Sequence, residues 1–149
     1  MGSQSDYSVM KDCEKILRIL KIKHQVSIIS AHRNPKRMFE FAESASKNGF
    51  AVIIAGAGGS AHLPGMVASL ATVPVIGVPI ESKKLKGLDS LLSIVQMPKG
   101  CPTATMVINA AFNAGLHAAS IIGNSDLKIK SNLEKWRRNQ TQSIKKKPK

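Results

Sequence analysis

The chain has 149 residues, of which 43% are hydrophobic, 21% charged and 4% aromatic. This length and balance are typical of a single soluble domain with an aliphatic core. No apolar run approaches the roughly 18 residues that a membrane helix needs, which speaks against an integral membrane protein. The first residues do not read as a secretory leader. Cys13 and Cys101 lie far apart with no metal-ligand pattern around them, so we expect a reduced, cytoplasmic protein with both thiols in packing roles.

The net charge of +13 is concentrated towards the C-terminus. Residues 128–149 hold nine of the 22 Lys and Arg but only one of the nine Asp and Glu. Such a run is typical of a solvated helix surface and tail. The chain has no interleaved aromatic residues for base stacking and no recognisable nucleic-acid module, so we expect neither a nucleic-acid nor a membrane partner. Nucleic-acid binding by the tail stays open as an alternative.

Along the chain, helix-like and strand-like patterns alternate. In chain order they predict a helix over 8–22, a strand over 24–30, a helix over 35–49, a strand over 51–57, a short helix over 62–71, a strand over 74–80, a short segment over 88–98, an Ala-rich helix over 104–122 and a last helix over 126–140. Nearly continuous apolar strands are typical of a parallel sheet buried on both faces. The alternation therefore favours a doubly wound α/β fold.

In such folds ligands bind outside the carboxyl ends of the strands, and the first polar loop there spans residues 2–6. Its small residues precede a helix, whose free N–H groups and dipole favour an anion. The Ser3 hydroxyl suits a phosphate oxygen, and the Asp6 carboxylate suits ribose hydroxyls. The alternative is that Ser5 or Asp6 only caps the helix.

The second polar loop spans residues 30–35 and follows a predicted strand directly. Arg33 is a permanent cation whose planar fork suits phosphate. His32 belongs to the residue type whose unperturbed pKa, about 6.5, makes it a proton carrier near neutral pH. The alternative is that His32 only enters the next helix and that Arg33 is a surface cation.

The third polar loop spans residues 55–65 and contains four glycines, Gly56, Gly58, Gly59 and Gly65. Glycine lets the backbone approach a ligand closely. The spacing resembles a dinucleotide fingerprint only superficially, because the third glycine is misplaced and Pro64 breaks the expected helix. His62 either donates to a substrate carboxylate or caps the next helix, and the residues leave this choice open.

Taken together, these loops resemble the 5-(carboxyamino)imidazole ribonucleotide mutase family, the mutase class of phosphoribosylaminoimidazole carboxylase catalytic subunits. The matching stretches are GSQSD, SAHRNP, FAESA, VIIAGAGGSAHLPGM, PVIGVP, DSLLSIVQMPKG and NAGLHAASI. They run from residue 2 to about residue 122, and two of them are long and idiosyncratic, which makes the resemblance far more specific than any single loop.

The resemblance implies a role for each loop residue. His32 is the implied general acid and base, and Ser3, Asp6 and Arg33 are the implied ligands of the ribose phosphate. The pocket around the imidazole and its carboxyl group is implied to be lined by Ser30, Ala31, Gly56, Gly58, Gly59, His62 and Leu63. The family uses neither a metal nor an organic cofactor, so none is expected here.

The implied reaction converts 5-(carboxyamino)imidazole ribonucleotide to 4-carboxy-5-aminoimidazole ribonucleotide in de novo purine biosynthesis, by decarboxylation and recarboxylation. Two alternatives stay open. One is a carboxylase that makes the same product from aminoimidazole ribonucleotide and free carbon dioxide. The other is an inactive phosphosugar-binding remnant.

The resemblance also implies an architecture, a flavodoxin-like three-layer fold in which the family's first strand is missing from this chain. We expect a catalytic α/β domain over 1–125 and a C-terminal helix with a basic tail over 126–149. The family assembles as a homo-octamer whose C-terminal helices pack on neighbouring subunits. Leu133 and Trp136 lie on one face of the last helix, and they pack either on a neighbour or on their own subunit.

Overall fold

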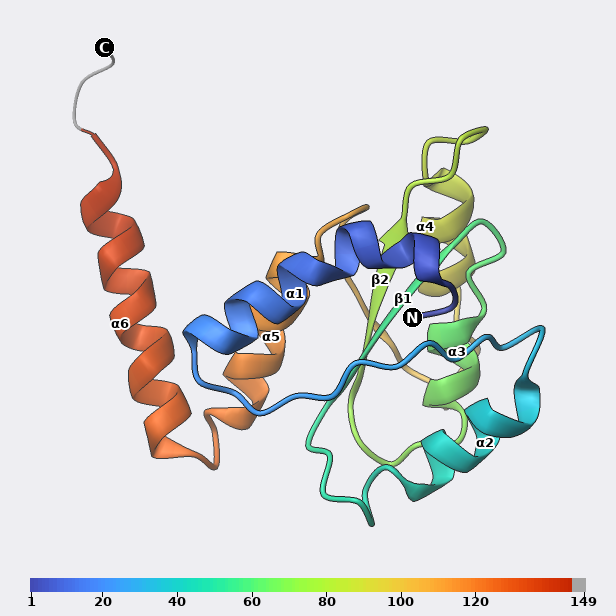
Figure 1. Cartoon of the computed structure of the whole chain (residues 1–149), viewed down its shortest axis with the longest axis horizontal. Coiled ribbons are helices and arrows are strands. Elements are labelled where there is room, and N and C mark those ends of the chain that lie inside the picture. The colour runs from blue at the N-terminus through green and yellow to red at the C-terminus, as the bar shows by residue number, and fades with distance from the viewer. Residues whose placement is uncertain (146–149) are drawn as a thin grey trace.

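The computed structural model describes residues 1–145, so residues 146–149 of the predicted basic tail lie outside the described part. Three parallel strands form one sheet in the order β1-β2-β3 (Figure 1). The strands are β1 (Ile53–Gly58), β2 (Val75–Ile80) and β3 (Ala104–Thr105).

Helices cover both faces of this sheet. One layer holds α1 (Tyr7–Ile19), which follows the short 3-10 turn η1 (Gln4–Asp6), together with α5 (Ala111–Ile122). The other layer holds α2 (Pro35–Ser44), α3 (Leu63–Ala68) and α4 (Leu88–Val95). The prediction of a doubly wound, three-layer α/β fold is thus confirmed.

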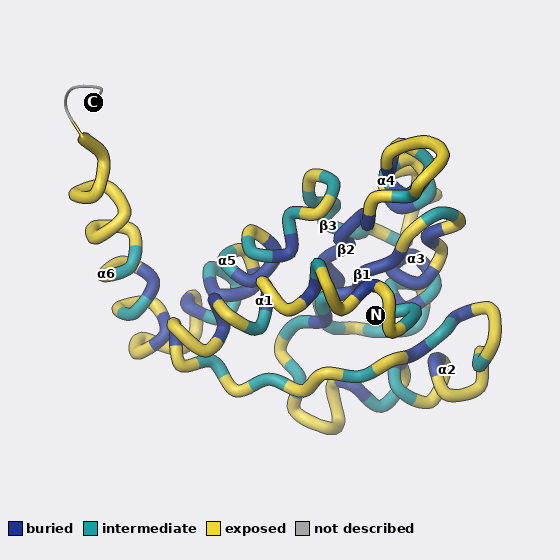
Figure 2. The backbone as a smooth tube through the Cα atoms, turned by 45° about the horizontal axis from the view of Figure 1, so that its top comes forward, coloured by how far each residue is buried: buried dark blue, intermediate teal, exposed yellow. Residues whose placement is uncertain are grey.

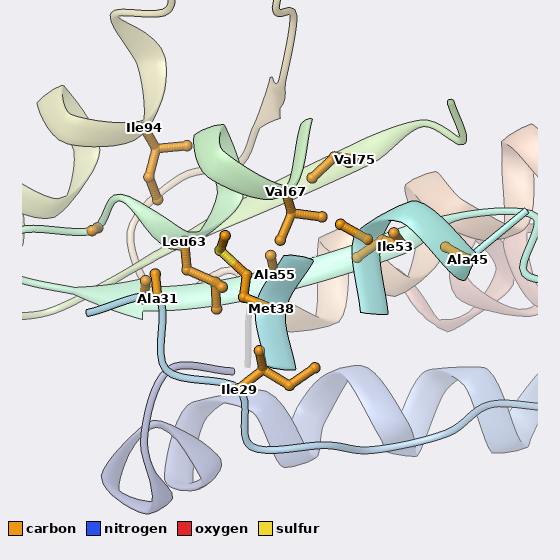
Figure 3. Close-up of a cluster of buried hydrophobic side chains, with 13 residues drawn as sticks. Ile29, Ala31, Met38, Ala45, Ile53, Ala55, Leu63, Val67, Val75 and Ile94 are labelled. Atoms are coloured by element: carbon orange, nitrogen blue, oxygen red, sulfur yellow. The ribbon is translucent and has the colours of Figure 1, made fainter. Parts of the chain in front are cut away.

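The two cores follow the period of two in the strands, because successive strand side chains point to opposite faces. In β1, Ile53 and Ala55 face α2 and α3, whereas Ile54, which lies between them in the chain, packs with the α1 and α5 core. Figure 3 shows the first of these cores, where Met38 of α2 and Leu63 of α3 meet the strand side chains. Both faces of the sheet are therefore buried, as the continuous apolar strands predict.

The last helix, α6 (Leu127–Ser143), lies outside this three-layer body and packs on it through a short apolar stripe. Ile129 and Leu133 are buried against α1 and α5, while most of the helix is exposed (Figure 2). Trp136 packs on Phe112 of its own subunit, with ring centroids 5.9 Å apart. None of the helices among residues 1–145 combines the length and the apolar character needed to cross a bilayer.

The predicted strand over 24–30 is wrong, because this extended segment belongs to no sheet. Met1 makes two strand-like backbone hydrogen bonds with this segment. Its amino group donates to Ser27 O (3.0 Å), and its carbonyl oxygen accepts from Ile29 N (2.8 Å). Gly2 N in turn donates to Gly56 O of β1 (3.1 Å). A strand needs a neighbour along its length, and in the described structure only Met1 and Gly2 lie between this segment and β1.

Two predicted helices also have different bounds in the structure. The helix predicted over 104–122 begins only at Ala111, because Ala104 and Thr105 pair with β2 and the chain then turns at Asn109, which has a φ of 61°. The helix predicted over 35–49 ends at Ser44, and a tight turn carries the chain on to Gly49. The remaining predicted helices and strands are confirmed with small shifts at their ends.

Candidate functional site

A cleft of about 930 Å³ opens beyond the carboxyl ends of β1 and β2. Its walls come from all three loops that the sequence singles out, together with the loop that follows β2. The loops meet here because parallel strands end at the same edge of the sheet. Residues that lie tens of positions apart in the sequence thereby line the same cleft.

Two histidines from different loops meet at this cleft. His32 Nε2 and His62 Nδ1 lie 2.9 Å apart, and the two rings are nearly perpendicular, with an interplanar angle of 88°. His62 stands at the N-cap of α3, but its side chain makes no capping bond and turns to His32 instead. A hydrogen bond between two imidazole nitrogens needs one protonated and one bare nitrogen, so the tautomers of the two rings are coupled.

Arg33 joins the first two loops. Its Nε donates to Ser30 Oγ (3.1 Å), and its Nη2 donates to the carbonyl oxygen of Gly2 (3.2 Å). The guanidinium is thereby fixed beside the start of η1 while the residue itself stays exposed. A fixed, permanently charged fork of this kind is suited to an anionic ligand.

Asp6 closes the first loop on itself. Its Oδ2 accepts a hydrogen bond from Ser3 N (2.9 Å), and the residue is only 8% exposed. Ser3 Oγ lies 2.6 Å from Ser5 Oγ, so the two hydroxyls form a pair at the rim of the cleft. The Asp6 side chain therefore makes no capping bond to α1 itself; it closes the 3-10 turn η1 from its last residue, and it lines the cleft as well.

The third loop is held by a serine from α4. Gly59 has a φ of 69°, a conformation that favours glycine, and its N–H donates to Ser90 Oγ (2.8 Å). Ser90 Oγ donates in turn to Ile80 O at the end of β2 (2.6 Å). Ser90 is fully buried, and it thus ties the glycine loop to the end of the neighbouring strand.

The structure brings nearly all of the predicted site residues to this cleft. Those that line it are Ser3, Asp6, Ser30, Ala31, His32, Arg33, Gly58, Gly59 and Leu63. His62 reaches it through its bond to His32. Gly56 does not line it: it lies inside β1, where an added Cβ would collide with Met10 Sδ.

Sequence reasoning missed part of the cleft wall, namely Glu81, Ser82, Lys83, Lys86 and Asn109. The first four follow the predicted strand over 74–80, so the rule that ligands bind beyond strand ends could have found them. Asn109 had no such signal. It enters the wall because its side chain bonds to the backbone N–H and the carboxylate of Glu81.

The described residues offer neither a metal-binding cluster nor a reactive thiol at Cys13. Among residues 1–145, no group of three or more His, Cys, Asp and Glu side chains is placed to hold a metal ion. Burial raises the pKa of the Cys13 thiol to about 12, which keeps it protonated and unreactive at neutral pH. The polar groups that line the cleft are the His32 imidazole, hydroxyls, a guanidinium, amines, carboxylates and the Asn109 amide.

The chain matches known proteins over nearly its whole length. A family model described as AIR carboxylase matches residues 1–143. The N5-carboxyaminoimidazole ribonucleotide mutase of Escherichia coli K12 is 51% identical over 146 residues, which is 97% of this chain and 86% of that protein. The mutase of Thermotoga maritima is 60% identical over 123 residues, which is 83% of this chain and 72% of that protein.

A solved structure gives the same result for the fold. The crystal structure of Treponema denticola PurE superposes with a TM-score of 0.88 at 26% sequence identity, covering 97% of this chain and 90% of that one. The match of the family model spans both the three cleft loops and the packed helices. The chain therefore belongs to the AIR carboxylase family.

Proposed function

We propose that this protein is an N5-carboxyaminoimidazole ribonucleotide mutase, an isomerase of de novo purine biosynthesis. The observation that carries the proposal is its 51% identity, over 97% of its length, to a protein of that name. The cleft supports it, since it combines a fixed cation for a phosphate with a histidine pair for proton transfer. The substrate is then 5-(carboxyamino)imidazole ribonucleotide, and the product is 4-carboxy-5-aminoimidazole ribonucleotide.

In this proposal the first two loops hold the ribose phosphate. Arg33 and the Ser3 hydroxyl bind phosphate oxygens, and Asp6 accepts from ribose hydroxyls. Lys83 and Lys86 line the same cleft and add positive charge to it. The pocket for the imidazole and its carboxyl group is formed by Ser30, Ala31, Gly58, Gly59, His62 and Leu63, with Gly56 supporting it from inside β1.

His32 is the general acid and base of the proposed reaction. The bond between the exocyclic nitrogen and the carboxyl carbon breaks, carbon dioxide is released, and that nitrogen takes a proton from His32. Ring carbon four then attacks the retained carbon dioxide, and the proton that leaves this carbon returns to His32. One group near its neutral pKa serves both steps. The cleft helps by holding carbon dioxide beside the ring.

His62 is a positioning residue in this scheme. Its bond to His32 fixes the orientation of that ring and ties its tautomer to the tautomer of His62. The proton on the shared edge belongs to one nitrogen only. When it is on His62 Nδ1, His32 Nε2 accepts the hydrogen bond and a neutral His32 carries its own ring proton on Nδ1.

The reaction is tested by supplying each substrate to the purified protein. A mutase converts the carboxyamino compound to product without added bicarbonate. It leaves aminoimidazole ribonucleotide unreacted unless carbon dioxide is present in large excess. Efficient conversion of aminoimidazole ribonucleotide with bicarbonate, and none of the carboxyamino compound, identifies a carboxylase instead. Binding of either ribonucleotide without turnover identifies the inactive remnant.

The role of His32 is tested by His32→Asn. We expect kcat to fall by about 100-fold or more with KM nearly unchanged, because the variant loses proton transfer and keeps the phosphate ligands. His117→Asn is the matched control, since His117 is exposed on α5 outside the cleft. A His32→Asn protein with wild-type kcat removes His32 from the mechanism.

The proposal extends to the assembly and location of the protein. The active unit is a homo-octamer in the cytoplasm, with residues 1–125 as its catalytic domain and 126–149 as the C-terminal helix and tail. The exposed length of α6 supports this, since Leu127 is 79% exposed and free to contact a neighbour. Light scattering on the purified protein tests the octamer, and cell fractionation tests the compartment.

A further inference from the structure

The loop of residues 81–87 joins β2 to α4 (Figure 1), and its Lys83 and Lys86 line the cleft. Arg33 lies on the opposite side of β1. Its guanidinium donates to the carbonyl oxygen of Gly2, whose N–H in turn donates to the edge of β1 that faces away from β2. Neighbouring strands are about 4.8 Å apart, so two such steps separate these walls of the cleft by about 10 Å. The cleft therefore carries positive charge on two opposite walls.

The backbone of this loop holds Lys86 in an uncommon conformation. Lys86 has a φ of 49°, and the next residue, Gly87, has a φ of 88°. Gly87 is closely packed, since an added Cβ would lie 2.7 Å from Ile108 Cγ2. Lys21 has a positive φ as well, but it follows the end of α1, where that conformation is common. No helix end accounts for Lys86, which precedes α4, and outliers of this kind cluster at ligand-binding sites.

The first acid beside the two lysines, Glu81, is held by a neutral side chain. Glu81 N donates to Asn109 Oδ1 (2.9 Å), and Asn109 Nδ2 donates to Glu81 Oε2 (3.1 Å). Asn109 itself has a φ of 61°, a conformation that asparagine tolerates. The two bonds together fix the position of the Glu81 carboxylate.

The second acid beside the lysines, Asp89, is also bound by neutral groups. Its Oδ1 accepts from Ser82 Oγ (2.8 Å) and from the N–H of Ser90 (2.9 Å). Within residues 1–145, the amines of Lys83 and Lys86 make no ion pair. Their charges are therefore not neutralised by this part of the chain, and both residues are exposed to an incoming anion.

We propose that Lys83 and Lys86 form a second anion subsite, so that the cleft binds a ribose phosphate with another anionic group at its far end. The ribose phosphate at Arg33 rests on the proposed function, whereas the second anion rests on the loop after β2. The cleft volume of about 930 Å³ lies near the upper end of the ~300–1,000 Å³ that ligand pockets span, which leaves room for both groups. The second anion is either the carboxylate of the carboxylated ribonucleotide or a diphosphate on the ribose.

Calorimetric titration of the full chain, with EDTA present, compares ribose 5-phosphate with 5-phosphoribosyl 1-diphosphate. The diphosphate ligand is expected to bind at least about 10-fold more tightly, because it reaches both walls. Lys83→Gln and Lys86→Gln are each expected to weaken its binding by about 3-fold or more and to leave the binding of ribose 5-phosphate unchanged. Lys84→Gln is the matched control, since Lys84 is exposed on the same loop but does not line the cleft, and a change below about 1.5-fold is expected there.

A second pair of ligands identifies the source of the anion. If the lysines bind the ring carboxylate, Lys83→Gln and Lys86→Gln weaken the binding of the carboxylated ribonucleotide but not that of aminoimidazole ribonucleotide. If they bind a diphosphate, both ribonucleotides keep their affinity and only the diphosphate ligand loses it. Either result supports the subsite.

Asn109 is a positioning residue of this subsite, because it keeps the Glu81 carboxylate from competing with the ligand for the lysines. Asn109→Gly keeps the positive φ without strain and frees Glu81, so it is expected to weaken the binding of the diphosphate ligand by about 3-fold. Adding Glu81→Gln to this variant is expected to restore the affinity. A loss that persists in the double variant would show that Asn109 only shapes the loop.

Three results overturn the subsite: equal affinity of the wild-type protein for the two sugar phosphates, binding of neither, or an equal loss of affinity in Lys84→Gln. None of these titrations requires turnover, so an inactive protein does not affect them. Arg33→Gln separates the two proposals. If the diphosphate ligand depends on the lysines but not on Arg33, the subsite stands and the phosphate role of Arg33 in the proposed function fails instead.

Discussion

At the scale of single residues, the cleft depends on side chains that do not themselves face the ligand. Ser90 is the clearest case, because it is fully buried and its hydroxyl links Gly59 N to Ile80 O. The hydroxyl is thus both acceptor and donor between two cleft loops. The precision of the glycine loop beside His32 therefore rests on a residue of α4.

Ser90→Ala is expected to lower the free energy of unfolding by about 1–3 kcal/mol, because the change leaves a buried backbone donor and acceptor without partners. Urea unfolding measures this. Ser69→Ala is the control, since Ser69 is exposed and donates to Met66 O one turn earlier in the chain, and a change within about 0.5 kcal/mol is expected there. A Ser90→Ala protein as stable as the control would show that water replaces the hydroxyl.

At the scale of elements, α6 shows how one cap compensates for an unfavourable sequence. Its first turn carries Lys128 and Lys130 and no acid, which opposes the positive end of the helix dipole. Asp126 Oδ1 accepts from the N–H groups of Lys128 (2.9 Å) and Ile129 (3.1 Å). The packing of α6 on the body adds a hydrogen bond from Asn132 Nδ2 to Leu20 O (2.9 Å). It also buries Ile129 and Leu133.

Asp126→Ala is expected to destabilise the chain by about 1 kcal/mol, since the cap and its negative charge are both lost. Asp126→Asn keeps the acceptor oxygen and is expected to cost less. Asn124→Ala, at an exposed position just before the cap, is the control. Circular dichroism during urea unfolding measures all three. If Asp126→Asn costs as much as Asp126→Ala, the charge and not the hydrogen bond stabilises the helix.

At the scale of the whole molecule, the amino group of Met1 is partly buried between segment 24–30 and the sheet, where it donates to Ser27 O. Burial lowers the pKa of this amino group below its usual value of 8.0, and the Asp6 carboxylate partly offsets the effect. Just below pH 8.0 the unfolded chain therefore binds a proton that the folded chain does not. The free energy of unfolding then rises with pH through this window and levels off above it.

This pH dependence is tested by comparing the free and the N-acetylated chain, with intact mass confirming that Met1 is retained. The difference between the two stabilities is expected to shrink as pH rises from about 6 to about 9, because acetylation removes the buried charge at every pH. Taking the difference cancels the contribution of the histidines. A difference that does not change with pH would mean that the amino group is solvated in the folded chain.

The sequence alone was sufficient for the α/β alternation and for the three loops of the cleft. Apolar strand runs mark a sheet with two covered faces, and small polar residues mark the strand ends. Local pattern also predicts the helix start at Pro35, where the Asn34 side chain accepts from Arg37 N. These features depend on residues within one turn or one strand, so a single stretch of sequence contains the whole physical cause.

Only the tertiary structure decided which distant residues meet. It brought His62 to within hydrogen-bond distance of His32, tied Gly59 to Ser90 and added Asn109 to the cleft wall. It also decided that residues 24–30 are extended without being a strand. A strand forms only when its backbone hydrogen-bonds to a neighbouring backbone, and a tertiary contact forms only when two segments pack together. Neither is therefore determined by the residues of one segment alone.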